Sequence, residues 1–191
     1  MTFQEHQLAV QQEIEWLDKQ LDQLDRSQLK VPQLVPHPRH EIVWRIPVPN
    51  HPDVFMTASN AADYEFIVYV NGLAFYRAWL MLGVRHYQGC PLRKDMPKDR
   101  NYYAAVDGFE GATDKNNPVP LAEPVPTTIE GNFAIGFANG MTRSMWLLAH
   151  EVAVFPVYVG SEASAVMLAQ HVGIAPPIKV SELREQCRSK A

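Results

Sequence analysis

The sequence predicts a mixed α+β fold, and three observations indicate it. Short runs rich in β-branched and aromatic residues alternate with stretches in which apolar residues recur at helical spacing. The 191 residues, 47% of them hydrophobic, suffice for one compact domain with an appended element. The two cysteines, Cys90 and Cys187, lie far apart and outside any Cys-x-x-Cys spacing. We therefore expect neither a disulfide framework nor a zinc cluster, and the chain fits a reducing cytosol.

The first expected element is an amphipathic helix over residues 4–29, which sets an N-terminal segment (residues 1–30) apart from a domain formed by residues 31–191. Apolar residues recur in steps of three and four, at Ile14, Leu17, Leu21 and Leu24. Four such positions are too few to define a coiled coil. The helix either lies on the domain's own core or serves as an arm for dimerisation or for a partner protein.

Between residues 31 and 72 the expected regular elements are strands, and a helix follows. Residues 31–49 contain five prolines and should form a stiff, extended connector with a short strand at 41–46. β-Branched and aromatic residues predict further strands at 53–59 and 65–70. The turn that follows leads into a stretch of helical spacing at 73–82.

The next stretch gives weaker signals. Glycines and prolines interrupt residues 86–112, which we expect to be irregular, with a short strand near 102–106. Residues 114–126 alternate apolar residues with prolines. Because proline removes a donor from a strand ladder, we expect an edge strand there.

The clearest pattern lies at residues 133–159. An apolar strand at 133–138 leads into the turn Asn139-Gly140, a helix at 142–151 and a second strand at 155–159. The buried side of this helix should carry Met145, Trp146, Leu148 and Ala149.

A second helix is expected at 162–171, with Ser161 as its N-cap and Gly173 at its end. The charged tail from Ser181 should be helical or frayed. His150 and His171 fall near helix C-termini, where a histidine usually caps the helix.

The turn before the 142–151 helix predicts an anion-binding site. The first N–H groups of a helix lack carbonyl partners, and the helix dipole adds positive potential there. Gly140 lets a ligand approach the backbone, Thr142 offers a hydroxyl group, and Arg143 offers a guanidinium that can hold two phosphate oxygens. Asn139, Gly140, Thr142 and Arg143 are therefore the candidate phosphate-binding residues. In the alternative interpretation, Asn139 merely caps the helix and Arg143 forms a surface salt bridge.

Arg143 would lie in the first helical turn, where the helix dipole disfavours a cation. A bound anion would account for this placement.

The acidic residues that could position a metal ion or a water are Asp107, Glu110, Asp114, Glu123 and Glu130. Only Glu123 and Glu130 lie on the strands expected to lead into the turn, so they are the candidate catalytic acids beside Arg143. Each could equally be a surface carboxylate. His37 and His40 are three apart, but Pro38 prevents a helical metal-binding pair, and we assign no certain metal ligand. The chain lacks the P-loop, Gly-x-Ser-x-Gly and His-Glu-x-x-His motifs.

Charge is distributed unevenly along the chain. The net charge of −4 argues against bulk nucleic-acid binding, and residues 1–25 are strongly acidic. Residues 85–100 are basic and supply the candidate nucleic-acid contacts Arg93, Lys94, Lys98 and Arg100. These segments could equally be ordinary solvated faces. We expect no signal peptide and no transmembrane segment, hence a cytoplasmic protein.

The 133–143 string, Trp146-Leu-Leu-Ala and Phe155-Pro-Val-Tyr-Val together resemble the core of the ParB/sulfiredoxin fold, and the preceding Asn117-Pro-Val-Pro-Leu-Ala resembles that family's preceding strand. The resemblance implies a ParB/sulfiredoxin-like mixed sheet with flanking helices and a core at 117–160. Sulfiredoxins place a cysteine and a histidine before the arginine, where this chain has Met141 and Thr142, so sulfinic acid reduction is not expected. ParB proteins carry a DNA-reading domain after the core, for which the 31 residues after Gly160 leave little room.

The chain most resembles the plasmid fertility-inhibition factors of this superfamily. The resemblance implies a plasmid-encoded inhibitor that blocks transfer of a rival DNA or DNA–protein substrate through a type IV secretion system. It also implies ATPase and DNase activity in the family's pocket, with ATP and Mg²⁺ as cofactors and DNA bound through its backbone. A location at the inner membrane, where the secretion machinery lies, and a homodimer are compatible with it.

Two hypotheses follow. The first is a nucleotide-hydrolysing, Mg²⁺-dependent nuclease that uses the anion site. The second is a non-catalytic inhibitor that binds the secretion coupling protein through the acidic N-terminal helix or through exposed Tyr102 and Tyr103.

Overall fold

The computed structural model describes residues 3–39, 41–83 and 91–189, so the predictions for His40 and Cys90 lie outside the described residues. The α-helices are α1 (Phe3–Gln23), α2 (Gly72–Gly83), α3 (Tyr102–Gly111), α4 (Met141–Ala149), α5 (Glu162–Val172) and α6 (Val180–Ser189). The strands are β1 (Gln33–Leu34), β2 (Val43–Ile46), β3 (Val54–Thr57), β4 (Phe66–Asn71), β5 (Val119–Pro120), β6 (Glu123–Ile129), β7 (Asn132–Asn139), β8 (Val154–Val159) and β9 (Ile178–Lys179). Two short 3₁₀ helices, η1 (Arg26–Gln28) and η2 (Arg93–Lys98), complete the described elements. The mixed α+β class expected from the sequence is confirmed.

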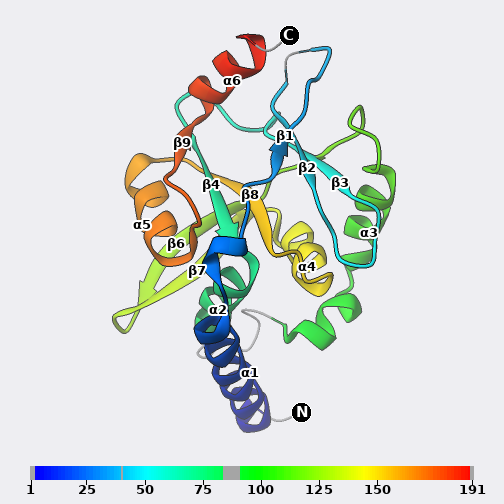
Figure 1. Ribbon diagram of the computed structural model, residues 1–191. Coiled ribbons are helices and arrows are strands. Elements are labelled where there is room, and N and C mark those ends of the chain that lie inside the picture. Colours follow the sequence, from blue (N-terminus) through cyan, green and yellow to red (C-terminus); the bar gives the residue numbers. More distant parts are fainter. Residues whose placement is uncertain (1–2, 40, 84–90, 190–191) are drawn as a thin grey trace.

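The strands form three sheets (Figure 1). One sheet has the order β1-β2-β3-β5, with β3 and β5 parallel, and a second has the order β8-β4-β9, with antiparallel pairs. Residues 119–122 join the two sheets: the Leu121 N–H donates to the Thr57 carbonyl at 3.0 Å, and the Tyr158 N–H donates to the Ala122 carbonyl at 3.1 Å. Strand β5 is the last strand of its sheet, as the prediction of an edge strand at 114–126 expects, although the Ala122 carbonyl just beyond it accepts from β8.

Strand β8 shows why the second sheet is central. All six of its residues are buried, as expected for a continuous apolar run covered on both faces. Aromatic side chains of helix α2 fill the space beside it, where the Phe75 ring meets the rings of Phe155 and Phe137 edge-on, at centroid distances of 5.4 and 5.9 Å. This packing sets the position of β7, and hence of the helix that follows it.

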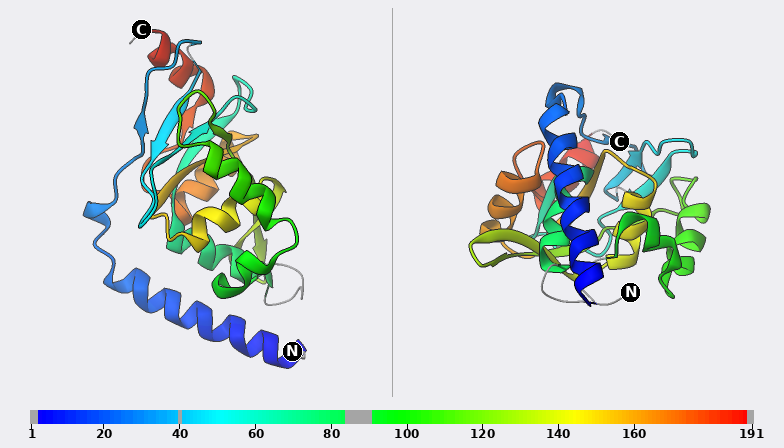
Figure 2. Two further views of the ribbon diagram at one scale, coloured as in Figure 1. Left: turned by 90° about the vertical axis from the view of Figure 1, so that its right-hand side faces the viewer. Right: turned by 90° about the horizontal axis from the view of Figure 1, so that it is seen from below.

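Helix α1 belongs to the same core. Val10, Ile14 and Leu17 are buried where α1 packs against α2, and Asp18 forms an ion pair with Arg77 of α2. From below, α1 crosses the whole molecule (Figure 2). The first of the two interpretations of this helix thus accounts for its apolar face, whereas the division at residue 30 stays a prediction.

The N-terminal helix ends at Gln23, not at residue 29 as predicted. The Asp25 carboxylate accepts a hydrogen bond from the Ser27 N–H at 3.0 Å and begins η1 instead. An aspartate that captures a nearby backbone N–H competes with helix continuation.

The strand predicted at 102–106 is wrong, because this segment is helix α3. Tyr102, Ala105 and Phe109 are buried at helical spacing, and this burial outweighs the low helix propensity of the two glycines at the C-terminal end. The sequence-based expectation that Tyr102 is exposed is also wrong, whereas Tyr103 is 67% exposed as expected.

Strands β6 and β7 form a long antiparallel hairpin that projects from the body (Figure 1). Its tip has positive φ at Glu130 (51°) and Gly131 (81°), as a tight hairpin turn requires. Its base leads into α4. The predicted Ser161 cap of α5 is confirmed, because its hydroxyl accepts from the Ser164 N–H. Among the described residues, no helix is both long and apolar enough to cross a bilayer.

Candidate anion-binding site

The turn into α4 is built around one glycine. Gly140 is the N-cap of α4 with a φ of 80°, and a β-carbon at this position would lie 2.6 Å from Cα and Cβ of Ala122. Glycine thus permits both the left-handed conformation and the close approach to residues 121–122. No side chain caps the helix, so the interpretation of Asn139 as its N-cap is wrong. The first N–H groups of α4 have no carbonyl of the preceding turn to bond.

Arg143 lies in the first turn of this helix and carries an unbalanced charge. Its Nη2 donates to the Leu121 carbonyl at 3.2 Å and to Oδ1 of Asn139 at 3.4 Å. Its Nε is buried and has no hydrogen-bond partner. No carboxylate among the described residues lies within 4.0 Å of it, so the alternative of a surface salt bridge is wrong.

Burial lowers the pKa of the Arg143 guanidinium from its ordinary value, and the nearby Tyr158 phenol counteracts part of this effect. Because arginine stays protonated in proteins, the burial leaves a cation that is poorly solvated and faces no anion. An anionic ligand would relieve this cost.

A cavity of about 410 Å³ opens beside this cation. Helix α3, residues 117–120 and the turn into α4 form its walls. Its polar lining residues are Asp107, Asn117, Asn139, Thr142 and Arg143. The structure therefore brings together all four predicted phosphate-binding residues in one cavity whose volume fits a small ligand.

Glu123 pairs with Asn139 at the base of the β6–β7 hairpin but is not among the residues that line the cavity. The Tyr158 hydroxyl donates to its carboxylate at 2.9 Å. Desolvation raises the pKa of Tyr158 to about 12, and the hydrogen bond to Glu123 adds to this shift. Tyr158 is thus a neutral donor at ordinary pH that positions Glu123 at the base of the hairpin.

Glu130 lies elsewhere. Strand pairing places Glu123 opposite Asn139 at the base of the β6–β7 hairpin, whereas Glu130 occupies the turn at its tip. The two residues are seven positions apart along an extended strand, or roughly 23 Å at ~3.3 Å per residue. The structure therefore does not bring Glu130 to Arg143.

Comparisons with known proteins identify the family of this chain. Residues 67–173 match the family of plasmid fertility inhibition factors. This chain belongs to that family. The protein Osa of Shigella flexneri is 65% identical over 176 residues, which make up 92% of each chain.

A solved structure supports the assignment. It is the gold(I) cyanide derivative of the oncogenic suppression activity protein, which is described as a plasmid fertility inhibition factor. That protein is 61% identical to this chain, and the superposition has a TM-score of 0.92 over 97% of this chain and 98% of the other. The resemblance to fertility-inhibition factors seen in the sequence is thus confirmed.

The basic segment of this fertility inhibition factor divides into two kinds of residue. The Arg93 guanidinium lies 5.4 Å from the Trp16 ring centroid and 5.3 Å from that of Tyr76, and it pairs with Glu151 at 3.1 Å. Lys94, Lys98 and Arg100 are exposed, although Lys98 pairs with Asp95 at 2.6 Å. Arg93 therefore joins α1 to the body, and the three exposed residues remain available to a polyanion.

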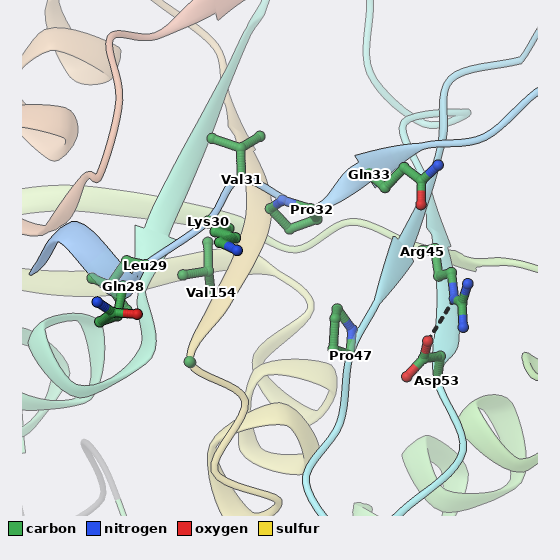
Figure 3. Close-up of a pocket in the computed structure, with 11 residues that line it drawn as sticks. Gln28, Leu29, Lys30, Val31, Pro32, Gln33, Arg45, Pro47, Asp53 and Val154 are labelled. Carbon is green, nitrogen blue, oxygen red and sulfur yellow. Dashed lines mark hydrogen bonds and ion pairs between the residues drawn. The ribbon is translucent and has the colours of Figure 1, made fainter.

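A second cavity, of about 420 Å³, lies between residues 28–33 and strands β2 and β8 (Figure 3). Its arginine, Arg45, already pairs with Asp53 at 2.5 Å. Because this cation is neutralised, the second cavity offers less to an anion than the cavity at Arg143.

The sequence reasoning missed three residues of the site. Asp107 was named among five acidic candidates but not selected, because it fell in a stretch expected to be irregular. Asn117 and Tyr158 entered only through the strand pattern and the family resemblance of their segments. A helical spacing of Tyr102, Ala105 and Phe109 was the available signal for α3, which carries Asp107. The described residues contain no cluster of three or more metal-ligating side chains.

Proposed function

We propose that this fertility inhibition factor acts by hydrolysing phosphate bonds, as an ATPase and Mg²⁺-dependent DNase, and thereby blocks transfer of a rival DNA or DNA–protein substrate through a type IV secretion system. One observation carries the proposal: the half-buried Arg143 cation has no carboxylate partner in the described part of the chain and lines a cavity beside a helix N-terminus. Phosphoryl transfer depends mainly on positioning and on neutralising charge, which such a site supplies.

Each lining residue has a role in this proposal. Arg143, Thr142 and the first N–H groups of α4 bind phosphate oxygens, and Asn139 helps to hold the guanidinium. Asp107 approaches from α3, on the other side of the cavity. Mg²⁺ is often held by one or two carboxylates together with substrate phosphates, so a single aspartate suits it.

Of the two candidate catalytic acids, Glu123 at the base of the hairpin suits the site better than Glu130 at its tip. Glu123 accepts from Tyr158 and is paired with Asn139 at the base of the hairpin, so we assign it, rather than Glu130, as the candidate catalytic acid. Lys94, Lys98 and Arg100 would contact the DNA backbone without reading sequence. We place the protein in the cytoplasm or at the inner face of the inner membrane, where the secretion machinery would be met.

Replacement of Arg143 tests the proposal. The Arg143→Ala variant should lose ATP turnover and DNA cleavage by roughly a hundredfold or more, the scale seen when one preorganised charge stabiliser is removed. Colorimetric phosphate release and plasmid nicking measure the two activities. Arg188→Ala, on the exposed face of α6, is the matched control and should keep both. Full activity in a folded Arg143→Ala protein would contradict the proposal.

The same variant separates the second candidate function, a non-catalytic inhibitor that binds the coupling protein. The exposed Leu8 (60%) and Tyr103 (67%) supply surface for such contact. If an inactive Arg143→Ala variant still inhibits transfer in a mating assay, binding explains inhibition. Deleting residues 1–29 is unsuited to this question, because Val10, Ile14 and Leu17 belong to the core.

A further inference from the structure

Two histidines lie side by side away from the Arg143 cavity. His51 belongs to the loop between β2 and β3, and His150 is the C-cap of α4. Their ring centroids are 5.7 Å apart, and the ring planes make an angle of 74°. Both residues are partly buried, so their rings are held by the protein yet remain within reach of solvent.

Hydrogen bonds fix the tautomer of both rings. Nδ1 of His51 lies 2.7 Å from the Pro52 carbonyl oxygen, and Nδ1 of His150 lies 2.8 Å from the Trp146 carbonyl oxygen. A carbonyl oxygen only accepts hydrogen bonds, so Nδ1 must carry the proton in each ring. Nε2 of each neutral ring then presents a lone pair. Metal-ligating histidines show this arrangement, in which the second ring nitrogen donates to a backbone carbonyl.

Packing on Trp146 orients both rings. The His150 ring stacks on the Trp146 indole at a centroid distance of 3.9 Å, and the His51 ring meets the same indole edge-on at 5.3 Å. Phe109 stacks on the indole at 4.1 Å and holds it in place. Little rotational freedom is therefore lost when the two rings share a ligand.

The separation of the rings suits one shared ion. A Zn–N bond of ~2.1 Å places the ion about 3.2 Å from each ring centroid, if about 1.1 Å is taken from ring centre to nitrogen. For a nitrogen–zinc–nitrogen angle between the tetrahedral value and a straight line, the two ring centroids would then lie roughly 5.2–6.4 Å apart. The observed 5.7 Å falls within this range.

We propose that Nε2 of His51 and Nε2 of His150 bind one divalent transition-metal ion, Zn²⁺ or Cu²⁺. Imidazole nitrogen suits these ions, whereas Mg²⁺ prefers oxygen, so this site is separate in place and in chemistry from the proposed Mg²⁺ site. Because the described residues provide no third ligand of the His, Cys, Asp or Glu type, water or a ligand from a partner completes the coordination. The ion ties the loop at residues 47–53 to the end of α4.

Calorimetric titration of the chelator-treated full chain with Zn²⁺ tests the site. The wild type should bind Zn²⁺. The affinity for Zn²⁺ should drop by roughly tenfold or more in His51→Gln, and likewise in His150→Gln, because each substitution removes one of the two protein ligands. His171→Gln is the matched control, since its ring stacks on Phe133 outside this pair and the variant should bind Zn²⁺ as the wild type does. Wild-type affinity in both variants of the pair would overturn the proposal.

A second measurement serves if either variant fails to fold. Cu²⁺ added to the wild type should broaden the imidazole NMR signals of His51 and His150 before those of other histidines, and the paramagnetic resonance spectrum should show two coupled nitrogens. Early broadening of other histidines alone, or a spectrum without nitrogen coupling, would exclude the site. Neither readout depends on nucleotide hydrolysis, so the result is independent of the proposed enzymatic function.

Discussion

At the scale of single residues, the candidate site depends on Gly140. Its positive φ and its contact with Ala122 bring the start of α4 against residues 121–122, where the Leu121 carbonyl accepts from Arg143. A larger residue would push the turn outward and separate the guanidinium from the carbonyl. The site is thus set by a missing side chain as much as by the polar groups around it.

A pair of glycine variants separates these two demands. Gly140→Ala should destabilise the protein by roughly 2–4 kcal/mol, because it combines a left-handed residue with a steric clash. Gly131→Ala has nearly the same φ of 81° but no atom within 4 Å of the added carbon, and should cost only about 1 kcal/mol. Urea unfolding measures both values. Equal losses in the two variants would show that close approach at Gly140 contributes nothing.

At the scale of elements, the basic segment contacts helix α1 in addition to exposing cations that a polyanion could bind. Arg93 lies over the Trp16 ring of α1 and pairs with Glu151, so one residue links three parts of the chain. Lys94, its neighbour, is exposed. Adjacent basic residues thus have different roles, which the number of charges in a sequence segment does not reveal.

Alanine variants of these neighbours should behave differently. Arg93→Ala should lower the free energy of unfolding by about 1–2 kcal/mol, since it removes cation–π contacts and an ion pair that is partly shielded from solvent. Lys94→Ala should change stability by less than about 0.5 kcal/mol, but it should reduce the salt dependence of DNA binding by about one charge. Thermal unfolding and binding at several salt concentrations test these expectations. A reversed pattern would assign Arg93, and not Lys94, to the proposed DNA-binding surface.

Much of the element structure was predictable, since it rests on local patterns. The strand–turn–helix–strand unit around Asn139-Gly140 follows the predicted order because apolar spacing and turn residues agree there. Helix α3 was missed because Gly108 and Gly111 suggest irregular chain, and the contacts that stabilise it come from α4 and η2. The pairing of residues 119–122 with β3 and β8 depends on distant segments, which no local pattern encodes.

The candidate site was predictable to the same degree. Gly140, Thr142 and Arg143 lie within four consecutive positions of one turn, so local reasoning could find them. Asp107 and Tyr158 reach the site from α3 and β8, and only the tertiary arrangement brings them there. Glu130 was selected because it was expected on a strand leading into the turn, yet the hairpin carries it away.

At the scale of the whole molecule, Tyr158 couples stability to alkaline pH. Its pKa rises to about 12 in the folded state, against about 10 in an unfolded chain. The folded state therefore retains a proton that the unfolded state loses between these values. Stability from this group is fully present below about pH 10 and falls as the pH rises toward 12.

The Tyr158→Phe variant should flatten this alkaline decline. Urea unfolding from pH 9 to 12 should show a shallower loss of stability than in the wild type, although burial also raises the pKa values of Tyr69 and Tyr102, which keep part of the slope. Tyr103→Phe, at an exposed position, is the control and should leave the slope unchanged. An identical slope in the Tyr158 variant and the wild type would show that the phenol titrates alike in both states.

The pairing of strands that lie far apart in the sequence has a consequence for synthesis of the chain. Strand β4 finds its neighbours β8 and β9 only among residues made much later, and β3 must wait for β5. At roughly 5–20 residues per second, β4 leaves the ribosome roughly 4 to 16 s before β8 exists. During this interval a strongly apolar strand has open edges, which are prone to pair with other chains. Nascent copies of this inhibitor should therefore need a holding chaperone until the last third of the chain has emerged.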